Sequence, residues 1–185
     1  MSSRPAPWRT LSERKLASYR VFDVTELHAQ RVDTGQAHTF FRIESVDWAN
    51  IIPITTTGEV VMIRQFRHGA GCETLEIPGG LLDADEDPGT AAARELLEET
   101  GYRAGKVVAL GSVHPNPALF KNRIHAFLAT GCEKVTEIAN DESEQTTIEL
   151  VPVDAIDGLL SSGAIDHALV MAAFHWWRLR GSPTA

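Results

Sequence analysis

Residues 80–102, GLLDADEDPGTAAARELLEETGY, contain the start and end signals of a helix within one short segment. Asp87 is a preferred N-cap residue, and Pro88 suits the first helical position because its missing N–H would have no intrahelical partner there. Gly101 suits the position just beyond the C-terminus, where the backbone turns left-handed. The segment therefore predicts a helix over about 88–100.

Three glutamates, Glu95, Glu98 and Glu99, lie within an arc of roughly 100° on adjacent turns of this expected helix. Like charges at these spacings cost about 0.2–0.5 kcal/mol each, and negative charge near a helix C-terminus opposes the helix dipole. The face is therefore either well solvated or balanced by a cation. Carboxylate oxygens at helical spacing suit Mg²⁺, Arg94 is placed to orient one of them, and Glu86 adds a further acid. The residues alone leave both interpretations open.

Length and composition restrict the class of protein. With 185 residues, of which 43% are hydrophobic and 23% charged, the chain fits one globular domain, alone or with a small appendage. The net charge of −8 disfavours nucleic acid as a partner. The N-terminus lacks the apolar core of a signal peptide and no later segment has the apolar run of a membrane span, so we expect a cytoplasmic protein without a membrane partner. Cys72 and Cys132 stand alone and receive no metal or redox role.

Strands dominate the expected secondary structure of the first half of the chain. Residues 18–32 and 37–46 predict a hairpin around a turn at 33–35, and residues 48–55 and 60–67 predict a second hairpin. After the 88–100 helix we expect strands near 105–113, 122–130 and 146–153, and two closing helices, the last over about 164–180.

The whole of residues 80–102 resembles the Nudix box, whose pattern is Gly, five residues, Glu, seven residues, then Arg-Glu-(apolar)-x-Glu-Glu-x-Gly-(apolar). Its fixed positions are occupied by Gly80, Glu86, Arg94, Glu95, Leu96, Glu98, Glu99 and Gly101. Tyr102 stands in the last position, where aliphatic residues are more usual. The resemblance implies an α/β protein with the Nudix α/β/α sandwich, a Mg²⁺ cofactor for which Mn²⁺ substitutes, and hydrolysis of a nucleoside diphosphate linked to another group.

Roles in the resembling enzymes carry over to this chain by position. Glu86 and Arg94 match residues that support the metal site, and Arg94 is counted in the catalytic set on that ground. The metal ligands that the resemblance implies are Gly79 through its carbonyl, Glu95, Glu98 and Glu99.

Flanking segments resemble the ADP-ribose and nucleoside-diphosphate-sugar pyrophosphatase branch of this family. They are RQFR at 64–67, LEIPGG at 75–80, and Asn-Pro at 116–117, where the proline lies sixteen residues after Gly101. Arg67 suits the substrate diphosphate because a guanidinium binds phosphate oxygens in a fork. The substrate-binding residues implied are Arg67, Glu76, Trp48 and Pro117. The aromatic residues that remain candidates for stacking on the base are Trp8, Phe22, Phe40 and Trp48.

The reaction implied is attack of a metal-activated water on one phosphorus of a P–O–P bridge, which yields AMP and ribose 5-phosphate from ADP-ribose. In the resembling enzymes the general base is a glutamate on a loop after the box. The acidic loop 140–145 occupies that region, so Glu142 is assigned as the base and Glu144 as a residue that assists a metal or the closure of the loop. His125 and His167 are assigned structural roles.

The resemblance also implies a domain organisation. Residues 46–185 are expected to form the Nudix hydrolase domain, and residues 1–45 an N-terminal antiparallel β hairpin extension through which such enzymes form homodimers. The expected partner is a small nucleoside diphosphate sugar. Two alternatives stay open: GDP-mannose or another nucleoside diphosphate sugar as the main substrate, and a non-catalytic Nudix nucleotide sensor, which the intact box disfavours.

Overall fold

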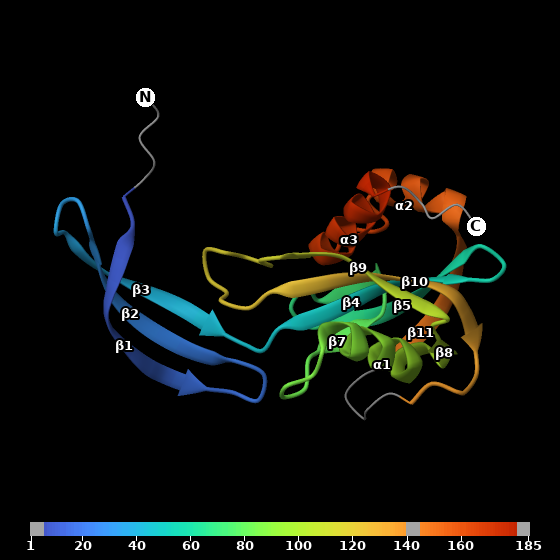
Figure 1. Cartoon of the computed structure of the whole chain (residues 1–185), viewed down its shortest axis with the longest axis horizontal. Coiled ribbons are helices and arrows are strands. Elements are labelled where there is room, and N and C mark those ends of the chain that lie inside the picture. The colour runs from blue at the N-terminus through green and yellow to red at the C-terminus, as the bar shows by residue number, and fades with distance from the viewer. Residues whose placement is uncertain (1–5, 140–144, 181–185) are drawn as a thin grey trace. The chain divides into compact units, whose positions relative to one another are not determined.

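The computed structural model describes residues 6–139 and 145–180. The chain divides into two compact units (Figure 1). The N-terminal unit consists of the chain up to Val46 together with His114–Arg123, and the catalytic unit consists of Asp47–Val113 and the chain from Ile124 onward. Within the described residues, no helix combines the length and the apolar character that crossing a membrane requires.

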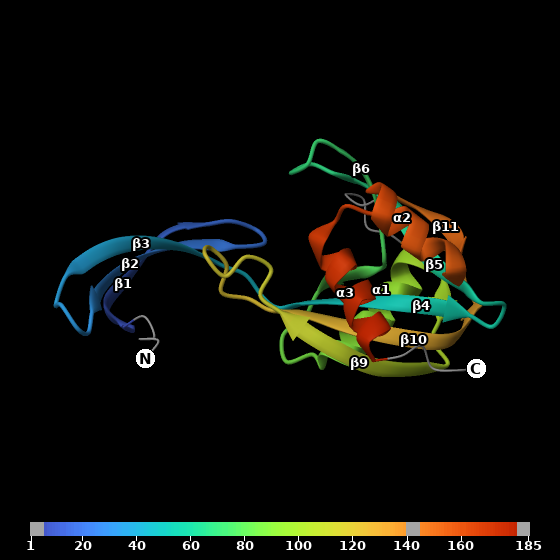
Figure 2. The same cartoon turned by 90° about the horizontal axis from the view of Figure 1, so that it is seen from above.

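The N-terminal unit is a three-stranded antiparallel sheet in the order β1 (Trp8–Ser18), β2 (Asp23–Arg31), β3 (Ala37–Glu44), drawn as a curved ribbon in Figure 2. The expected hairpin is confirmed: β2 and β3 pair across a turn that contains Gly35 at a φ of 72°. Strand β1 was not expected, because its central residues TLSERK are mostly polar or charged and lack the β-branched run that marks a strand. The segment 114–123 returns to this sheet, where Ile43 N–H donates to the Leu119 carbonyl at 2.8 Å.

A mixed sheet forms the centre of the catalytic unit. Its main path has the order β11-β5-β4-β10-β8, while β6 pairs with β5, β7 with β4 and β9 with β10. The central strand β4 runs parallel to β10 and antiparallel to β5. These strands are β4 (Trp48–Thr55), β5 (Glu59–Arg67), β6 (Cys72–Glu76), β7 (Gly79–Leu81), β8 (Tyr102–Arg103), β9 (Lys106–Val113), β10 (Ile124–Lys134) and β11 (Thr146–Pro152).

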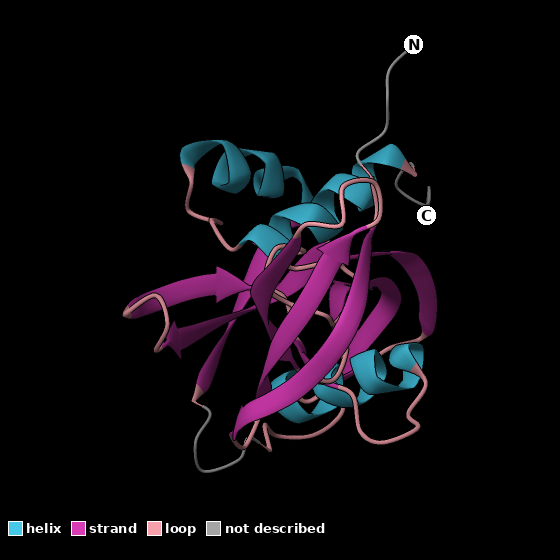
Figure 3. Ribbon diagram, turned by 90° about the vertical axis from the view of Figure 1, so that its left-hand side faces the viewer, coloured by secondary structure: helices cyan, strands magenta, loops and turns pink. Residues whose placement is uncertain are grey.

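Helices cover both faces of this sheet, as Figures 1 and 3 show. Helix α1 (Pro88–Thr100) packs on one face, and α2 (Ile156–Ser162), preceded by the 3₁₀ turn η1 (Val153–Ala155), and α3 (Ala168–Leu179) pack on the other. Side chains of β4 alternate between the two layers: Ile51 packs with α1, whereas Ile52 packs with α3. The α/β/α sandwich is therefore confirmed.

Helix α1 has the ends that its sequence predicts. The Asp87 side chain accepts hydrogen bonds from the backbone N–H groups of Gly89 (3.0 Å) and Thr90 (3.1 Å). Gly101 follows the helix at a φ of 72°, and a Cβ at that position would lie 2.0 Å from the carbonyl oxygen of Thr136. Conformation and space both require glycine there, so the helix ends at the expected residue. The last helix, in contrast, begins at Ala168 and not near 164.

Candidate active site

Arg94 lies among the acidic residues around α1 and offsets part of their charge. Its Nη1 atom is 2.9 Å from Glu95 Oε1 and 3.0 Å from Glu98 Oε2, and its Nε and Nη2 atoms are each 3.0 Å from the carboxylate of Glu86. Nη2 also donates to the Leu81 carbonyl at 3.1 Å. These hydrogen bonds, chiefly those with Glu86, raise the pKa of Arg94 above its usual range, and they lower the pKa of Glu86. The guanidinium of Arg94 therefore reduces the repulsion among the carboxylates that it contacts.

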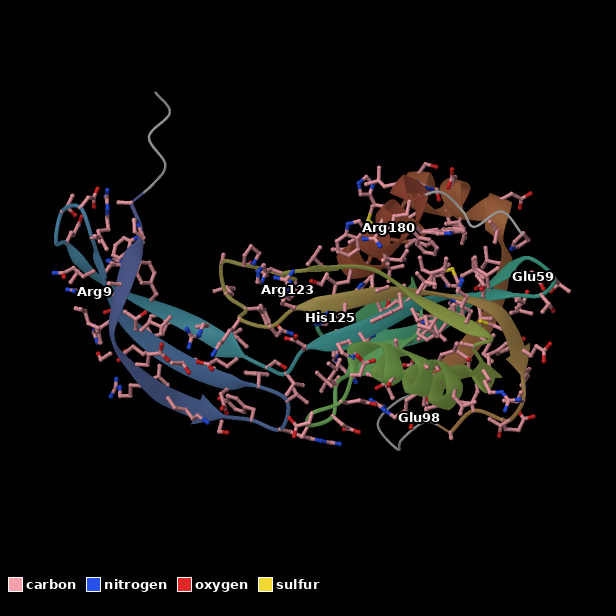
Figure 4. All side chains as sticks on the ribbon, viewed as in Figure 1. Arg9, Glu59, Glu98, Arg123, His125 and Arg180 are labelled. Atoms are coloured by element: carbon pink, nitrogen blue, oxygen red, sulfur yellow. The ribbon has the colours of Figure 1, made fainter. Side chains whose placement is uncertain are left out.

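Two of the predicted metal ligands lie directly against the backbone of β7. The Gly79 N–H donates to Glu99 Oε2 at 2.9 Å, and Glu99 is only 3% exposed. A Cβ on Gly80 would lie 2.3 Å from Glu95 Oε1, so only glycine lets that carboxylate approach. Glu98 lies at the lower edge of α1 in Figure 4, with 47% of its side chain exposed. The structure thus brings Gly79, Glu95 and Glu99 together and leaves Glu98 at the rim.

The atoms that could ligate a metal here are all oxygens, and a hard divalent cation prefers oxygen ligands. Among the described residues, no three His, Cys, Asp or Glu side chains converge closely enough to form a complete cage for a metal ion. Two carboxylates beside a backbone segment instead fit a cation that takes its remaining oxygens from water and from a ligand. The residues present therefore fit a hard divalent cation as a shared ion, and Arg94 holds Glu95 and Glu98 in place.

A second cluster joins the ends of β5 and β6. Arg67 binds Glu76 through two hydrogen bonds of 2.8 Å, and Thr74 Oγ1 donates to the same carboxylate at 2.5 Å. Glu76 is 2% exposed. Burial raises the pKa of Glu76, but the hydrogen bonds from Arg67 and Thr74 outweigh burial, so the pKa lies below its usual value and the carboxylate is ionised. The Arg67 guanidinium also lies 5.9 Å from the centre of the Trp48 ring, a cation–π contact.

Trp48, Arg67 and Glu76, three of the predicted substrate-binding residues, thus lie together. They line a cavity in the catalytic unit, together with Gly79 at its edge. Asn50 and His167 line the same cavity, although the sequence gives no role to Asn50 and only a structural role to His167. The available signal was an asparagine inside the apolar strand 49–53; no local pattern connects it with a histidine more than 100 residues later.

The remaining predicted residues belong to the other unit or lie outside the described residues. Pro117 belongs to the N-terminal unit, where the Asn116 side chain accepts the Ala118 N–H at 3.2 Å and forms a turn around it. Glu142 and Glu144 lie outside the described residues. The assignments of Pro117 to substrate and of Glu142 and Glu144 to catalysis therefore stay predictions.

Comparisons with known proteins relate the chain to one family. A model of the NUDIX domain matches residues 46–174. The chain is similar to the ADP-ribose pyrophosphatase of Bacillus subtilis (strain 168), with 29% identity over 82% of this chain and 83% of that protein. It is similar to the methanol dehydrogenase activator of Bacillus methanolicus, with 35% identity over 89% of this chain and 92% of that protein. A crystal structure of an ADP compounds hydrolase shares the fold, with a TM-score of 0.82 at 23% identity, over 97% of this chain and 99% of that chain.

Proposed function

Because the chain belongs to the Nudix family of hydrolases, we propose that it hydrolyses the diphosphate bond of ADP-ribose or a related nucleoside diphosphate sugar. The observation that carries the proposal is the placement of Glu95 and Glu99 against Gly79 and Gly80, fixed by Arg94. The name of the Bacillus subtilis relative, an ADP-ribose pyrophosphatase, supports this choice of substrate. The products from ADP-ribose are AMP and ribose 5-phosphate.

Each residue of the cluster has a definite task in this proposal. Glu95 and Glu99, with Glu98 and the carbonyl of Gly79, would hold Mg²⁺, for which Mn²⁺ can substitute. When bound, the ion lowers the pKa of a water molecule and neutralises diphosphate charge. Arg94 orients Glu95 and Glu98 at 2.9 and 3.0 Å, and the Gly79 N–H orients Glu99. Orientation of this kind matters because a misplaced carboxylate weakens metal affinity and activity.

The second cluster is proposed to face the substrate. The bidentate pair with Glu76 fixes the guanidinium of Arg67 above the Trp48 ring, so it is positioned before the substrate arrives. Substrate phosphate oxygens attract this cation even though Glu76 balances part of its charge. The proposal also includes three residues whose roles come from the resemblance. Glu142 is the general base, Glu144 assists a metal or the closure of the loop, and Pro117 contacts the substrate.

The proposal is tested by hydrolysis of ADP-ribose, GDP-mannose, UDP-glucose and diadenosine polyphosphates, with and without Mg²⁺, and with identification of the products. We expect Mg²⁺-dependent release of AMP and ribose 5-phosphate from ADP-ribose. Glu99→Gln keeps the side-chain shape and an acceptor for the Gly79 N–H but removes the charge, so kcat should fall at least about 100-fold.

Glu73→Gln is the matched control, because Glu73 is an exposed acid of β6 whose ion pair with Arg64 spans 3.3 Å. Its turnover should equal that of the wild type. Undiminished turnover by Glu99→Gln would contradict the metal assignment. Absence of cleavage for every nucleoside diphosphate sugar in the panel would contradict the substrate class.

A further inference from the structure

The cavity beside Gly79 contains an unusual concentration of polar atoms without partners. Among the described residues, six buried side-chain nitrogen or oxygen atoms lack a hydrogen-bond partner. Three of them, Trp48 Nε1, Asn50 Oδ1 and His167 Nδ1, belong to residues that line this one cavity. An unpaired buried polar group costs folding free energy, so three in one place call for an explanation.

Asn50 is the most buried of the three residues, at 8% exposed. Its Nδ2 atom donates to the Leu169 carbonyl at 3.4 Å, which leaves Oδ1 as an acceptor without a partner. Strand β4 places Trp48 two residues earlier, on the same face of the sheet as Asn50. The strand thus offers one hydrogen-bond acceptor and one donor side by side.

Helix α3 begins at the same cavity. His167 occupies its N-cap position without making a side-chain capping bond, and Leu169 and Val170 of the first turn line the cavity. The first N–H groups of a helix have no partner within the helix. The cavity therefore has the first turn of α3 on one side and the polar edge of β4 on the other.

The size of the cavity and the charges around it restrict which chemical groups it can bind. The cavity has a volume of about 20 Å³, which is room for one or two groups the size of a water molecule. An anion is disfavoured next to Asn50, because Glu76 is ionised and Asn50 Oδ1 is an acceptor, while Glu76 balances part of the charge of Arg67. A hydroxyl group fits, since it donates one hydrogen bond and accepts others.

We propose that this cavity recognises a sugar hydroxyl of the substrate, through Asn50 Oδ1 as acceptor and Trp48 Nε1 as donor, with His167 Nδ1 as the third partner. This inference rests on the proposed function, because Gly79 both lines the cavity and holds Glu99. The hydroxyl comes either from the ribose of the nucleoside or from the sugar on the second phosphate. In the free protein a water molecule can occupy the same position, and a ligand hydroxyl that replaces it keeps its hydrogen bonds.

The test compares Trp48→Phe and Asn50→Leu with the wild type in binding two products, AMP and ribose 5-phosphate, in the presence of Mg²⁺. Each product contains one of the two sugars. Trp48→Phe removes the indole N–H and keeps an aromatic ring, and Asn50→Leu removes the Oδ1 acceptor together with the Nδ2 donor, so the affinity for one product should fall about three- to tenfold.

Trp177→Phe is the matched control: Trp177 Nε1 is also buried without a partner among the described residues, but Trp177 packs in the core against Phe174. Its affinities for both products should equal those of the wild type. Loss confined to ribose 5-phosphate assigns the cavity to the distal sugar, and loss confined to AMP assigns it to the nucleoside ribose.

Unchanged binding of both products by Trp48→Phe and Asn50→Leu overturns the inference, as does a wild type that binds neither product. These outcomes are separate from hydrolysis. A wild type that cleaves ADP-ribose while both variants keep wild-type product affinities refutes the cavity assignment and leaves the proposed function standing. A wild type that cleaves no sugar nucleotide refutes the proposed function, whereas the binding constants still test the cavity.

Discussion

Buried charged side chains of the site are stabilised by ion pairs and hydrogen bonds. Glu76 is the clearest case: it is 2% exposed, and its carboxylate receives two hydrogen bonds from Arg67 and one from Thr74. Breaking a buried pair on one side leaves an uncompensated charge, which is far more costly than the pair itself. The pair therefore makes the stability of the catalytic unit depend on pH.

The sign of that dependence follows from the lowered pKa of Glu76. In the unfolded chain Glu76 takes up its proton near pH ~4.3, whereas in the folded protein it does so only at lower pH. Its contribution to stability is therefore complete above pH ~4.3 and is lost as the pH falls toward the folded pKa. Below pH ~4.3 the unfolding free energy of the wild type should decrease as the pH falls. In Glu76→Gln this decrease should be less steep, by up to about 1.4 kcal/mol per pH unit, measured by urea denaturation between about pH 3 and 6.

Glu137→Gln is the control for this measurement, since the Glu137 side chain is 91% exposed. Its pH dependence should match that of the wild type. If Glu76→Gln also showed the wild-type slope, the pair with Arg67 would not be the source of the acid sensitivity.

At this scale, sequence predicts the residues that belong to one local pattern and misses those brought together by topology. Glu95, Glu99 and Arg94 share one helix, so their proximity follows from helical spacing. Asn50 and Leu169, which come within hydrogen-bond distance, are 119 residues apart in the chain. Only the packing of α3 on β4 joins them, and one sequence contains no local sign of that contact.

Among the secondary-structure elements, α1 is the one whose position the site depends on most. Its C-terminal half carries Glu95 and Glu99, and its N-terminus is fixed by the Asp87 cap. Sequence predicts both ends because each end has its own chemical signal, the cap at Asp87 and the left-handed Gly101. Strand β1, in contrast, is held by pairing with β2, and pairing leaves little trace in the residues of one strand alone.

Removal of the helix cap should weaken folding without changing the chemistry. Asp87→Ala removes the acceptor of the Gly89 and Thr90 N–H groups, so the free energy of unfolding should fall by about 1 kcal/mol. Because the carboxylates of Glu95 and Glu99 lie at the other end of the helix, kcat should stay close to the wild-type value. Denaturant unfolding and steady-state kinetics on the same preparations check both statements.

Asp87→Asn retains a side-chain oxygen that can accept the same bonds and should restore most of the stability. An alanine variant as stable as the wild type would show that tertiary packing alone fixes the start of α1.

At the scale of the whole molecule, the N-terminal sheet stands out because it has only three strands. Its strands expose several large apolar side chains, and small isolated sheets are marginally stable in water. The exposed apolar residues of β1 and β3 are Trp8, Leu11, Leu16, Phe40 and Phe41. Exposed large apolar side chains on neighbouring strands favour a surface that another molecule covers. We propose that a second copy of the chain covers it, which makes the protein a homodimer.

The dimer is tested by light scattering during size-exclusion chromatography. The wild type should have twice the mass of the chain, and a double variant, Trp8→Ser with Phe40→Ser, should shift toward the monomer, because these two rings contact each other 5.0 Å apart on one face of the sheet. Leu179→Ser is the control, an exposed apolar residue at the end of α3. A wild type that elutes as a monomer, or a double variant that remains a dimer, would contradict the proposal.

The outer edge of β1 affects how readily the protein aggregates at high concentration. Its pairing with β2 is interrupted by two register shifts, between Thr10 and Ser12 and between Lys15 and Ala17, and charged side chains lie along the strand between them. Bulges twist an edge away from a flat template, and lysine and other charges oppose the addition of a further strand. Strand-by-strand growth into fibres is thereby blocked at this edge, so the sheet can offer apolar faces for a closed pair without becoming the start of an aggregate.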